Sequence, residues 1–168
     1  LAARGPDGPS LWVGHNRRFS ALSRETLAHF AGVPGRQVIA TVRAAPVPAD
    51  NWYQDPAEGG GILFGDVCHF IDLAIWFAES LPVEVHAFEA PDPSHRHEGW
   101  AIHLRFASGG LGIVHYVCGS HDGYPRESVD VLGGGRSARL SGFRELVLRG
   151  GDGRRRIRRI QPDAGQKP

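Results

Sequence analysis

Apolar and polar residues alternate along much of the second half of the chain. Every second residue from Trp100 to Phe106 is apolar, and His103 and Arg105 stand between them. This two-residue period predicts a half-buried β-strand. Similar or wholly apolar runs predict further strands at residues 37–45, 83–90, 111–118, 127–132, 137–140 and 145–148, and residues 154–160 are the last predicted strand, after a glycine-rich turn. Residues 111–118 are apolar on both faces, which favours a central strand, and glycine-rich turns at 108–110 and 150–153 predict hairpins.

A helical period replaces the alternation in two places. The first predicted helix runs to about residue 31, with Ser20 or Ser23 as its N-terminal cap. The second follows the triple glycine at 59–61 and covers about residues 62–77. It is apolar nearly all round, as in a buried helix.

The order of the predicted elements defines the fold class. A strand at residues 11–16, a helix, a strand, a long loop and the buried helix precede about six consecutive strands. We therefore predict an α+β fold with a large, mostly antiparallel open sheet and helices on one face. A partner is expected on the uncovered face, and residues 161–168 are expected to be a loose tail.

Composition narrows the class of protein. The chain has 168 residues, 41% of them hydrophobic and 22% charged, which fits one globular domain. A net charge of +1 gives no field that would favour nucleic acid, and no apolar run reaches the ~20 residues of a membrane span. Two cysteines are too few for a disulfide scaffold, so we expect a reduced, cytoplasmic protein. Methionine is absent even from position 1, which indicates a piece of a longer chain or a processed product.

Three ionisable residues interrupt the buried helix. Asp66, His69 and Asp72 are spaced three apart, so an α-helix would place them on one side. A carboxylate one turn away can fix the tautomer of an imidazole and keep its pKa high, which suits proton transfer near neutral pH. The alternative is a core histidine that its neighbours satisfy. The preceding glycines likewise fit either close approach of a ligand or a plain tight turn.

Three other patterns are interpreted structurally. Residues 133–138 match G-x-G-x-x-A, but no long helix can follow them, so a glycine-rich hairpin is favoured over a dinucleotide site. The remaining histidines, including His95 and His97, are scattered, and no metal site is expected. Five arginines between residues 154 and 159 could hold phosphate, but an edge strand protected by charge is the favoured interpretation.

Three segments carry a resemblance to a known family. They are VGHNRRFSAL, DNWYQDPAEGGGILFGDVCHFIDLAIWF and YPRESVDVLGGGRSARLSGFREL. Together they resemble the carboxy-terminal domain of the Gfo/Idh/MocA oxidoreductases, in particular the bi-domain subgroup with a GGG-x-x-x-G-[DE]-x-C-H-F-I-D string. The resemblance spans about residues 11–149.

The resemblance implies an enzyme and its site. It implies a glyceraldehyde-3-phosphate dehydrogenase-like C-terminal domain that acts with a Rossmann domain binding NAD or NADP, on a sugar, cyclitol or related polyol or ketone. The histidine of the glycine-rich helix, His69, would be the acid/base, and Asp66, Asp72, Trp52 and Arg17 would bind substrate. Asn16 would face the cofactor. The open sheet would form a homo-oligomer interface.

The same resemblance defines the expected domain boundaries. Residues 1–16 would be the tail of a nucleotide-binding domain that is missing here, ending in its last strand. Residues 17–160 would be the substrate-binding and oligomerisation domain, and 161–168 the loose tail. The family's usual acid, four residues before the histidine, corresponds to Gly65. Without the Rossmann domain and its lysine the chain alone is expected to be inactive. The alternative is a non-catalytic sheet domain for assembly or sugar binding.

Overall fold

The architecture was obtained from a computed structural model. It describes residues 13–48, 50–52, 55, 58–90, 99–151 and 153–165. The helical elements are η1 (Asn16–Phe19), α1 (Ala21–His29), η3 (Leu63–Val67) and α2 (Cys68–Ala78). The strands are β1 (Gln37–Ala44), β2 (Pro82–Ala90), β3 (Gly99–Phe106), β4 (Leu111–Cys118), β5 (Glu127–Gly133), β6 (Arg136–Ser141), β7 (Glu145–Gly150) and β8 (Gly153–Arg158).

The eight strands form one sheet in the order β2-β3-β4-β1-β5-β6-β7-β8. Only β1 and β4 are parallel, with Gln37 opposite Leu111 and Ala44 opposite Cys118. Every other pair is antiparallel. This confirms the predicted α+β class, the central position of residues 111–118 and the glycine-rich hairpin at 133–135.

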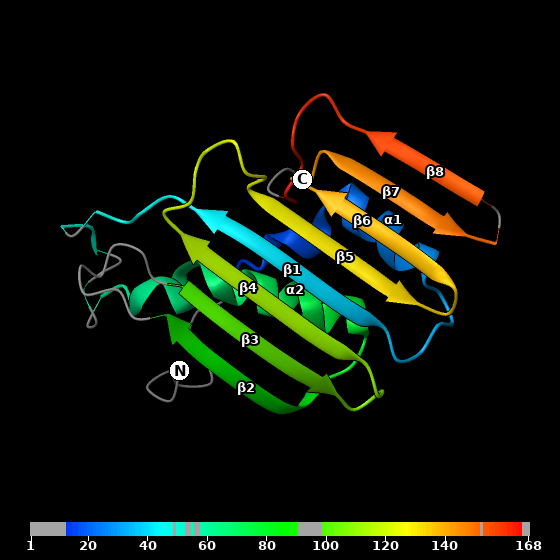
Figure 1. Cartoon of the computed structure of the whole chain (residues 1–168), viewed down its shortest axis with the longest axis horizontal. Coiled ribbons are helices and arrows are strands. Elements are labelled where there is room, and N and C mark those ends of the chain that lie inside the picture. The colour runs from blue at the N-terminus through cyan, green and yellow to red at the C-terminus, as the bar shows by residue number, and fades with distance from the viewer. Residues whose placement is uncertain are drawn as a thin grey trace, which may run out of the picture.

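Both α-helices cover the same face of the sheet (Figure 1). Helix α2 packs on β1 and β4, and α1 packs on β6 and β7. Phe70, Leu73 and Phe77 of α2 are buried, as are the inward side chains Val38 and Val114 of the two central strands. Burial of each such side chain stabilises the fold by roughly 1.5–3 kcal/mol. The opposite face of the sheet carries no helix in the described residues, so its side chains are partly exposed.

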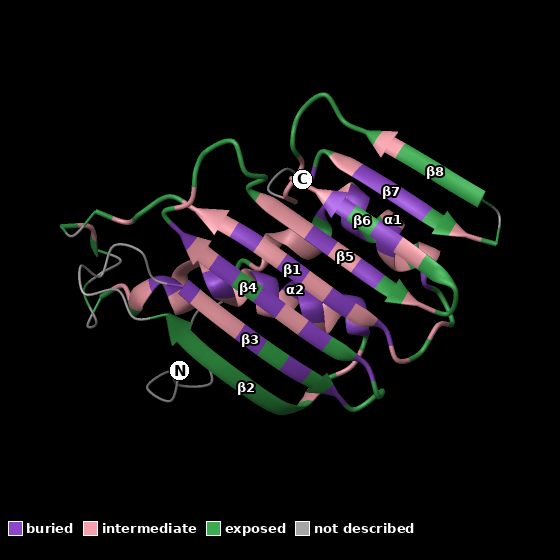
Figure 2. Cartoon of the chain, viewed as in Figure 1, coloured by how far each residue is buried: buried purple, intermediate pink, exposed green. Residues whose placement is uncertain are grey.

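The two edge strands are exposed (Figure 2). Residues 83–90 of β2 are exposed on both faces, although Val83 and Val85 are apolar. Strand β8 carries the arginine run, and Arg156 and Arg158 both bind Glu145 of the neighbouring β7. The edge-strand interpretation of that run is therefore confirmed, since charge at an open edge discourages pairing with another sheet.

Both ends of the described chain differ from the sequence predictions. Residues 13–15 form no strand, and a 3-10 turn begins at Asn16, so a strand over residues 11–16 is wrong for its described part. Nor is the tail loose at residues 163–165. The Asp163 carboxylate accepts the Ala21 N–H at the start of α1, at 3.1 Å, and that contact lowers the pKa of Asp163. Asp163 therefore supplies the cap that was expected from Ser20 or Ser23.

The remaining predictions on loops are partly outside the described residues. Tyr53 and the histidines His95 and His97 fall there. No helix within the described ranges is long and apolar enough to span a membrane.

Candidate active site

The start of the buried helix departs from α-helical geometry. Gly60 and Gly61 both have positive φ, at 66° and 77°, which turns the chain into the helix at positions that favour glycine. Residues 63–67 then form the π-helical turn η3 before α2 begins. A π-turn holds an extra residue per turn, so it rotates Asp66 out of the register that an unbroken α-helix would give it.

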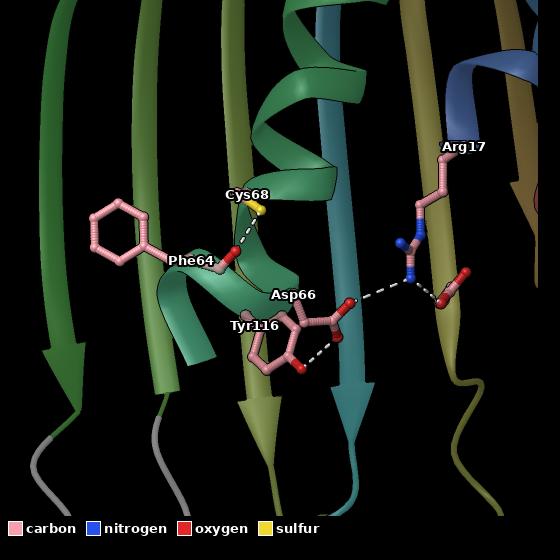
Figure 3. A network of polar contacts seen from close by, with 6 residues as sticks. Arg17, Phe64, Asp66, Cys68 and Tyr116 are labelled. Carbon is pink, nitrogen blue, oxygen red and sulfur yellow. Dashed lines mark hydrogen bonds and ion pairs between the residues drawn. The ribbon is translucent and has the colours of Figure 1, made fainter. Parts of the chain in front are cut away.

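Asp66 is held by partners from two other elements (Figure 3). The Tyr116 hydroxyl of β4 donates to Asp66 Oδ2 at 2.6 Å. Arg17 Nη2 of η1 lies 3.5 Å from Asp66 Oδ1 and also donates to Glu127 Oε1 of β5 at 3.0 Å. Burial and the neighbouring Asp66 carboxylate raise the pKa of Tyr116, so the phenol stays a donor. The carboxylate is thus fixed in one orientation.

Arg17 joins the sheet and the buried helix. Its guanidinium lies over the Phe70 ring, 4.3 Å from the ring centroid, and its side chain is 11% exposed. A guanidinium shielded in this way acts on nearby charges more strongly than one in water. It is the strongest fixed positive charge close to His69.

Asp72 belongs to a second cluster. The Arg18 guanidinium donates to both of its carboxylate oxygens, with Nε at 2.9 Å from Oδ2. His15 Nδ1 lies 3.2 Å from Asp72 Oδ1. The His15 ring also contacts the His69 ring edge-on, with centroids 5.4 Å apart and an angle of 78° between the planes.

His69 stands between the two clusters. The residue is partly buried, and its Nδ1 is buried with no hydrogen-bond partner in the described part of the chain. Burial and the Arg17 guanidinium lower its pKa, and the opposing effects of Asp66 and Asp72 are smaller. The prediction that the flanking carboxylates keep this pKa high is therefore wrong. The ring is neutral near pH 7, which is the form that accepts a proton.

A pocket of about 400 Å³ opens beside Asp66. Asp66, Tyr116 and Arg126 provide its ionisable groups, and Asn51 provides an amide. Its apolar part is formed by Ile62 and by residues 44–48 after β1. The volume suits a small polar ligand. His69 is not among the residues that line this pocket.

The predicted site residues are thus divided among neighbouring positions. The structure brings Asp66 and Arg17 together, and it places Asp72 with Arg18 and His15. The Oδ1 atom of Asn16 is buried without a hydrogen-bond partner among the described residues. Trp52 is 58% exposed, next to Asn51 of the pocket.

Sequence reasoning missed Tyr116, Glu127 and His15. Tyr116 had the clearest signal, because its hydroxyl occurs at an inward position of an apolar strand and buried tyrosines need a partner. The partners of Glu127 and His15 lie 110 and 57 residues away along the chain, and no local pattern marks such contacts.

Within the described ranges, no group of three His, Cys, Asp or Glu side chains is placed to hold a metal ion. The described elements include no strand–helix–strand unit of the kind that binds a dinucleotide.

Comparison with known proteins gives a family match. The model of a family described as the GFO/IDH/MocA C-terminal domain matches residues 35–139. No curated protein matches the chain.

Several solved structures share the fold. A Thermotoga maritima protein assigned as a dehydrogenase is 26% identical, with a TM-score of 0.65, over 88% of this chain and 46% of that protein. A UDP-N-acetylglucosamine 3-dehydrogenase from Acidithiobacillus ferrooxidans is 15% identical, with a TM-score of 0.71, over 92% and 48%. An Agrobacterium radiobacter oxidoreductase in complex with NAD+, L-tartaric acid and magnesium is 16% identical, with a TM-score of 0.67, over 90% and 48%. The chain spans about half the length of these structures.

Proposed function

This chain belongs to the Gfo/Idh/MocA C-terminal domain family, and on that premise we propose that it is the substrate-binding domain of an NAD(P)-dependent oxidoreductase. Members of its structural neighbourhood are dehydrogenases and oxidoreductases. The observation that supports catalysis in this chain is the environment of His69. A partly buried imidazole with a lowered pKa lies at the start of the helix, one turn from a fixed carboxylate.

We assign His69 the role of acid/base. The neutral ring accepts the proton of a substrate hydroxyl at Nε2, because Nδ1 is buried. Arg17 keeps the ring neutral before the reaction, and Asp66 and Asp72 limit how far the pKa falls. In the reverse direction the imidazolium returns the proton to the alkoxide oxygen.

The pocket beside Asp66 supports a sugar, cyclitol or related polyol as substrate. Carboxylate, phenol, amide and guanidinium groups converge there, which suits a ligand with several hydroxyl groups. Trp52 would cover one face of the ligand, and Arg17 holds Asp66 in position for it. One structural relative is named as a dehydrogenase of a UDP-sugar, and another was solved in complex with L-tartaric acid. Both molecules are rich in hydroxyl groups, which is consistent with this substrate class.

The nicotinamide cofactor would be held mainly by a Rossmann domain that is outside this chain. When bound, NAD or NADP accepts or supplies the hydride. Asn16 would contact it through the side-chain oxygen that has no partner in the described residues. We expect the 168-residue chain by itself to show no binding of NAD(P) in a fluorescence titration. Measurable binding of NAD(P) by this chain would contradict the proposal that a separate domain holds most of the cofactor.

The experiment is a His69→Gln substitution in the longest reading frame that contains this chain. A panel of sugars, inositols and sugar nucleotides is assayed by NAD(P)H absorbance. Loss of a general acid/base costs ~10²–10⁴-fold in kcat. His103→Gln is the matched control, because His103 is an exposed histidine on the helix-free face of β3. Equal loss in both variants, or none in His69→Gln, would overturn the assignment.

The second candidate function is assembly through the uncovered face of the sheet. The exposed face carries apolar side chains on the two strands that flank β1, Leu111 on β4 and Leu132 on β5, and both lie opposite Gln37. We propose that two copies associate through this face. Sedimentation velocity of wild type and of Leu132→Glu tests it: a dimer that the charge dissociates supports assembly, and a monomer in both does not.

Cys68 is a free thiol that donates to the Phe64 carbonyl. We propose a reducing, cytoplasmic compartment on this ground.

A further inference from the structure

His15 occupies a position between the acid/base candidate and a carboxylate. Its Nδ1 lies 3.2 Å from Asp72 Oδ1, and its ring meets the His69 ring edge-on at 5.4 Å. Asp72 therefore faces the Nδ1 edge of His15, and this contact restrains the plane of the His15 ring.

We propose that His15 is a positioning residue for His69, and that the Asp72–His15 pair fixes the orientation of the His69 ring and sets its proton affinity. This inference rests on the proposed function, in which His69 is the acid/base. It assigns a role to a histidine that precedes His69 by 54 residues and that no pattern in the sequence marks.

The geometry explains how the orientation is fixed. His69 has no hydrogen-bond partner at Nδ1 in the described residues, so hydrogen bonding at that atom does not hold its ring. An edge-on contact between two rings is directional, because the electron-poor edge of one ring meets the electron-rich face of the other. His15 in turn cannot rotate without losing Asp72. Asp72 and His69 both belong to α2. His15 contacts both side chains, and this restrains the orientation of the His69 ring.

The charges around the pair explain the proton affinity. Asp72 is shared by His15 and the Arg18 guanidinium of η1, so its charge is largely neutralised. Arg17 acts on His69 from η1, and Asp66 acts from η3. Cys68, the chain neighbour of His69, stays neutral because burial raises its thiol pKa. The remaining variable charge is that of His15 itself, and a proton on it lowers the pKa of His69.

Two imidazoles that interact titrate as a coupled pair. A positive charge on the His15 ring makes protonation of His69 less favourable. His69 therefore keeps its neutral, proton-accepting form to a lower pH than it would beside an uncharged ring.

The test uses the 168-residue chain and requires no activity. The His69 ring is followed by two-dimensional NMR during a pH titration of wild type, His15→Phe and His15→Gln. Phenylalanine keeps an aromatic ring but removes the charge, so the His69 midpoint is expected to move up in pH. Glutamine keeps a polar contact to Asp72 but removes both ring and charge, so the midpoint again moves up and the ring signals broaden. His103→Phe is the control and leaves the His69 midpoint unchanged.

The outcomes separate this inference from the proposed function. An unchanged His69 midpoint in a folded His15→Phe protein overturns the positioning role, whatever the enzyme does. The His69 midpoint could shift in His15→Phe while His69→Gln retains full activity in the longer reading frame. That result would support the coupling of the two rings and overturn the acid/base assignment. If His69 is the acid/base and His15 positions it, the acidic limb of the pH–kcat profile moves to higher pH in His15→Phe.

Discussion

At the scale of single residues, His69 links protonation to stability. Its pKa lies below the ordinary value of 6.5 in the folded chain, because burial and Arg17 disfavour the imidazolium. Well above pH 6.5 both folded and unfolded chains hold a neutral ring, and His69 contributes no pH dependence there. Below it the unfolded chain binds the proton first, so the folded state loses stability as pH falls through the interval down to the folded pKa.

We therefore predict a difference between wild type and His69→Gln. Between about pH 7.5 and about pH 5, wild type should lose more of its free energy of unfolding than the variant, since glutamine binds no proton. Urea unfolding at several pH values measures this. Parallel pH dependences for the two proteins would show that the ring is as easily protonated in the fold as in the unfolded chain.

The residue scale also shows the limit of sequence patterns. Spacing of three identified Asp66, His69 and Asp72 as the ionisable groups of a buried helix, and each of them contacts a polar side chain of another segment. The three side chains were predicted to lie together on one side of the helix. They have different partners, however, because Asp66 contacts Tyr116 of β4 and Asp72 contacts Arg18. The choice of partners depends on tertiary contacts that helical periodicity does not encode.

At the scale of elements, one buried arginine joins the ends of both α-helices. The Arg36 side chain is 4% exposed. Its guanidinium donates to the carbonyls of Phe30, just after α1, and Phe77 in the last turn of α2, both at 2.8 Å. It also binds the Val33 carbonyl and the Glu79 carboxylate. Carbonyls at helix ends lack partners within the helix, so this one side chain satisfies several of them.

We predict that Arg36→Lys lowers the free energy of unfolding by about 2–4 kcal/mol, because an ammonium cannot span the four acceptors and leaves buried carbonyls unpaired. Chemical denaturation monitored by circular dichroism gives the value. Arg139→Lys is the matched control: Arg139 forms an exposed two-point contact to Asp130 and should cost less than about 1 kcal/mol. A small effect at Arg36 would mean that water replaces the lost contacts.

The elements themselves were largely predictable from the sequence, because alternation and glycine turns specify strands locally. The ranges of β3, β4 and β5 follow the apolar pattern within one residue. The π-turn η3 was not predictable, since its residues have the same apolar character as the α-helix that follows. Nor was the cap of α1, because its carboxylate comes from the far end of the chain.

At the scale of the whole molecule, the two ends of the described chain are in contact. Asp163 binds Ala21, and the Asp163 N–H donates to the Phe143 carbonyl at 3.0 Å. Gly165 has a φ of +78°, and a Cβ added there would lie 2.0 Å from the Asn16 carbonyl oxygen. Residues 163–165 therefore hold the segment that carries Asn16, Arg17 and Arg18, so the tail supports the candidate site from outside it.

We predict that Gly165→Ala displaces this tail and lowers stability by about 1–2 kcal/mol, through the steric clash and the loss of the Asp163 cap. Thermal unfolding measures the change. Gly14→Ala is the control, since its added Cβ would meet nothing within 4 Å. The same displacement should also increase hydrogen exchange at residues 16–20. Unchanged exchange there would show that the tail lies against the segment without holding it.

The parallel pairing of β1 with β4 determines when the sheet can close during synthesis. Gln37 has no partner on that side until Leu111 has left the ribosome, and its other neighbour, Leu132, is made later still. Strands β5 to β8, by contrast, pair in sequence as short hairpins that form as soon as they emerge. A nascent chain must therefore carry β1 with both edges open until β4 emerges, and that strand is where a chaperone would be needed.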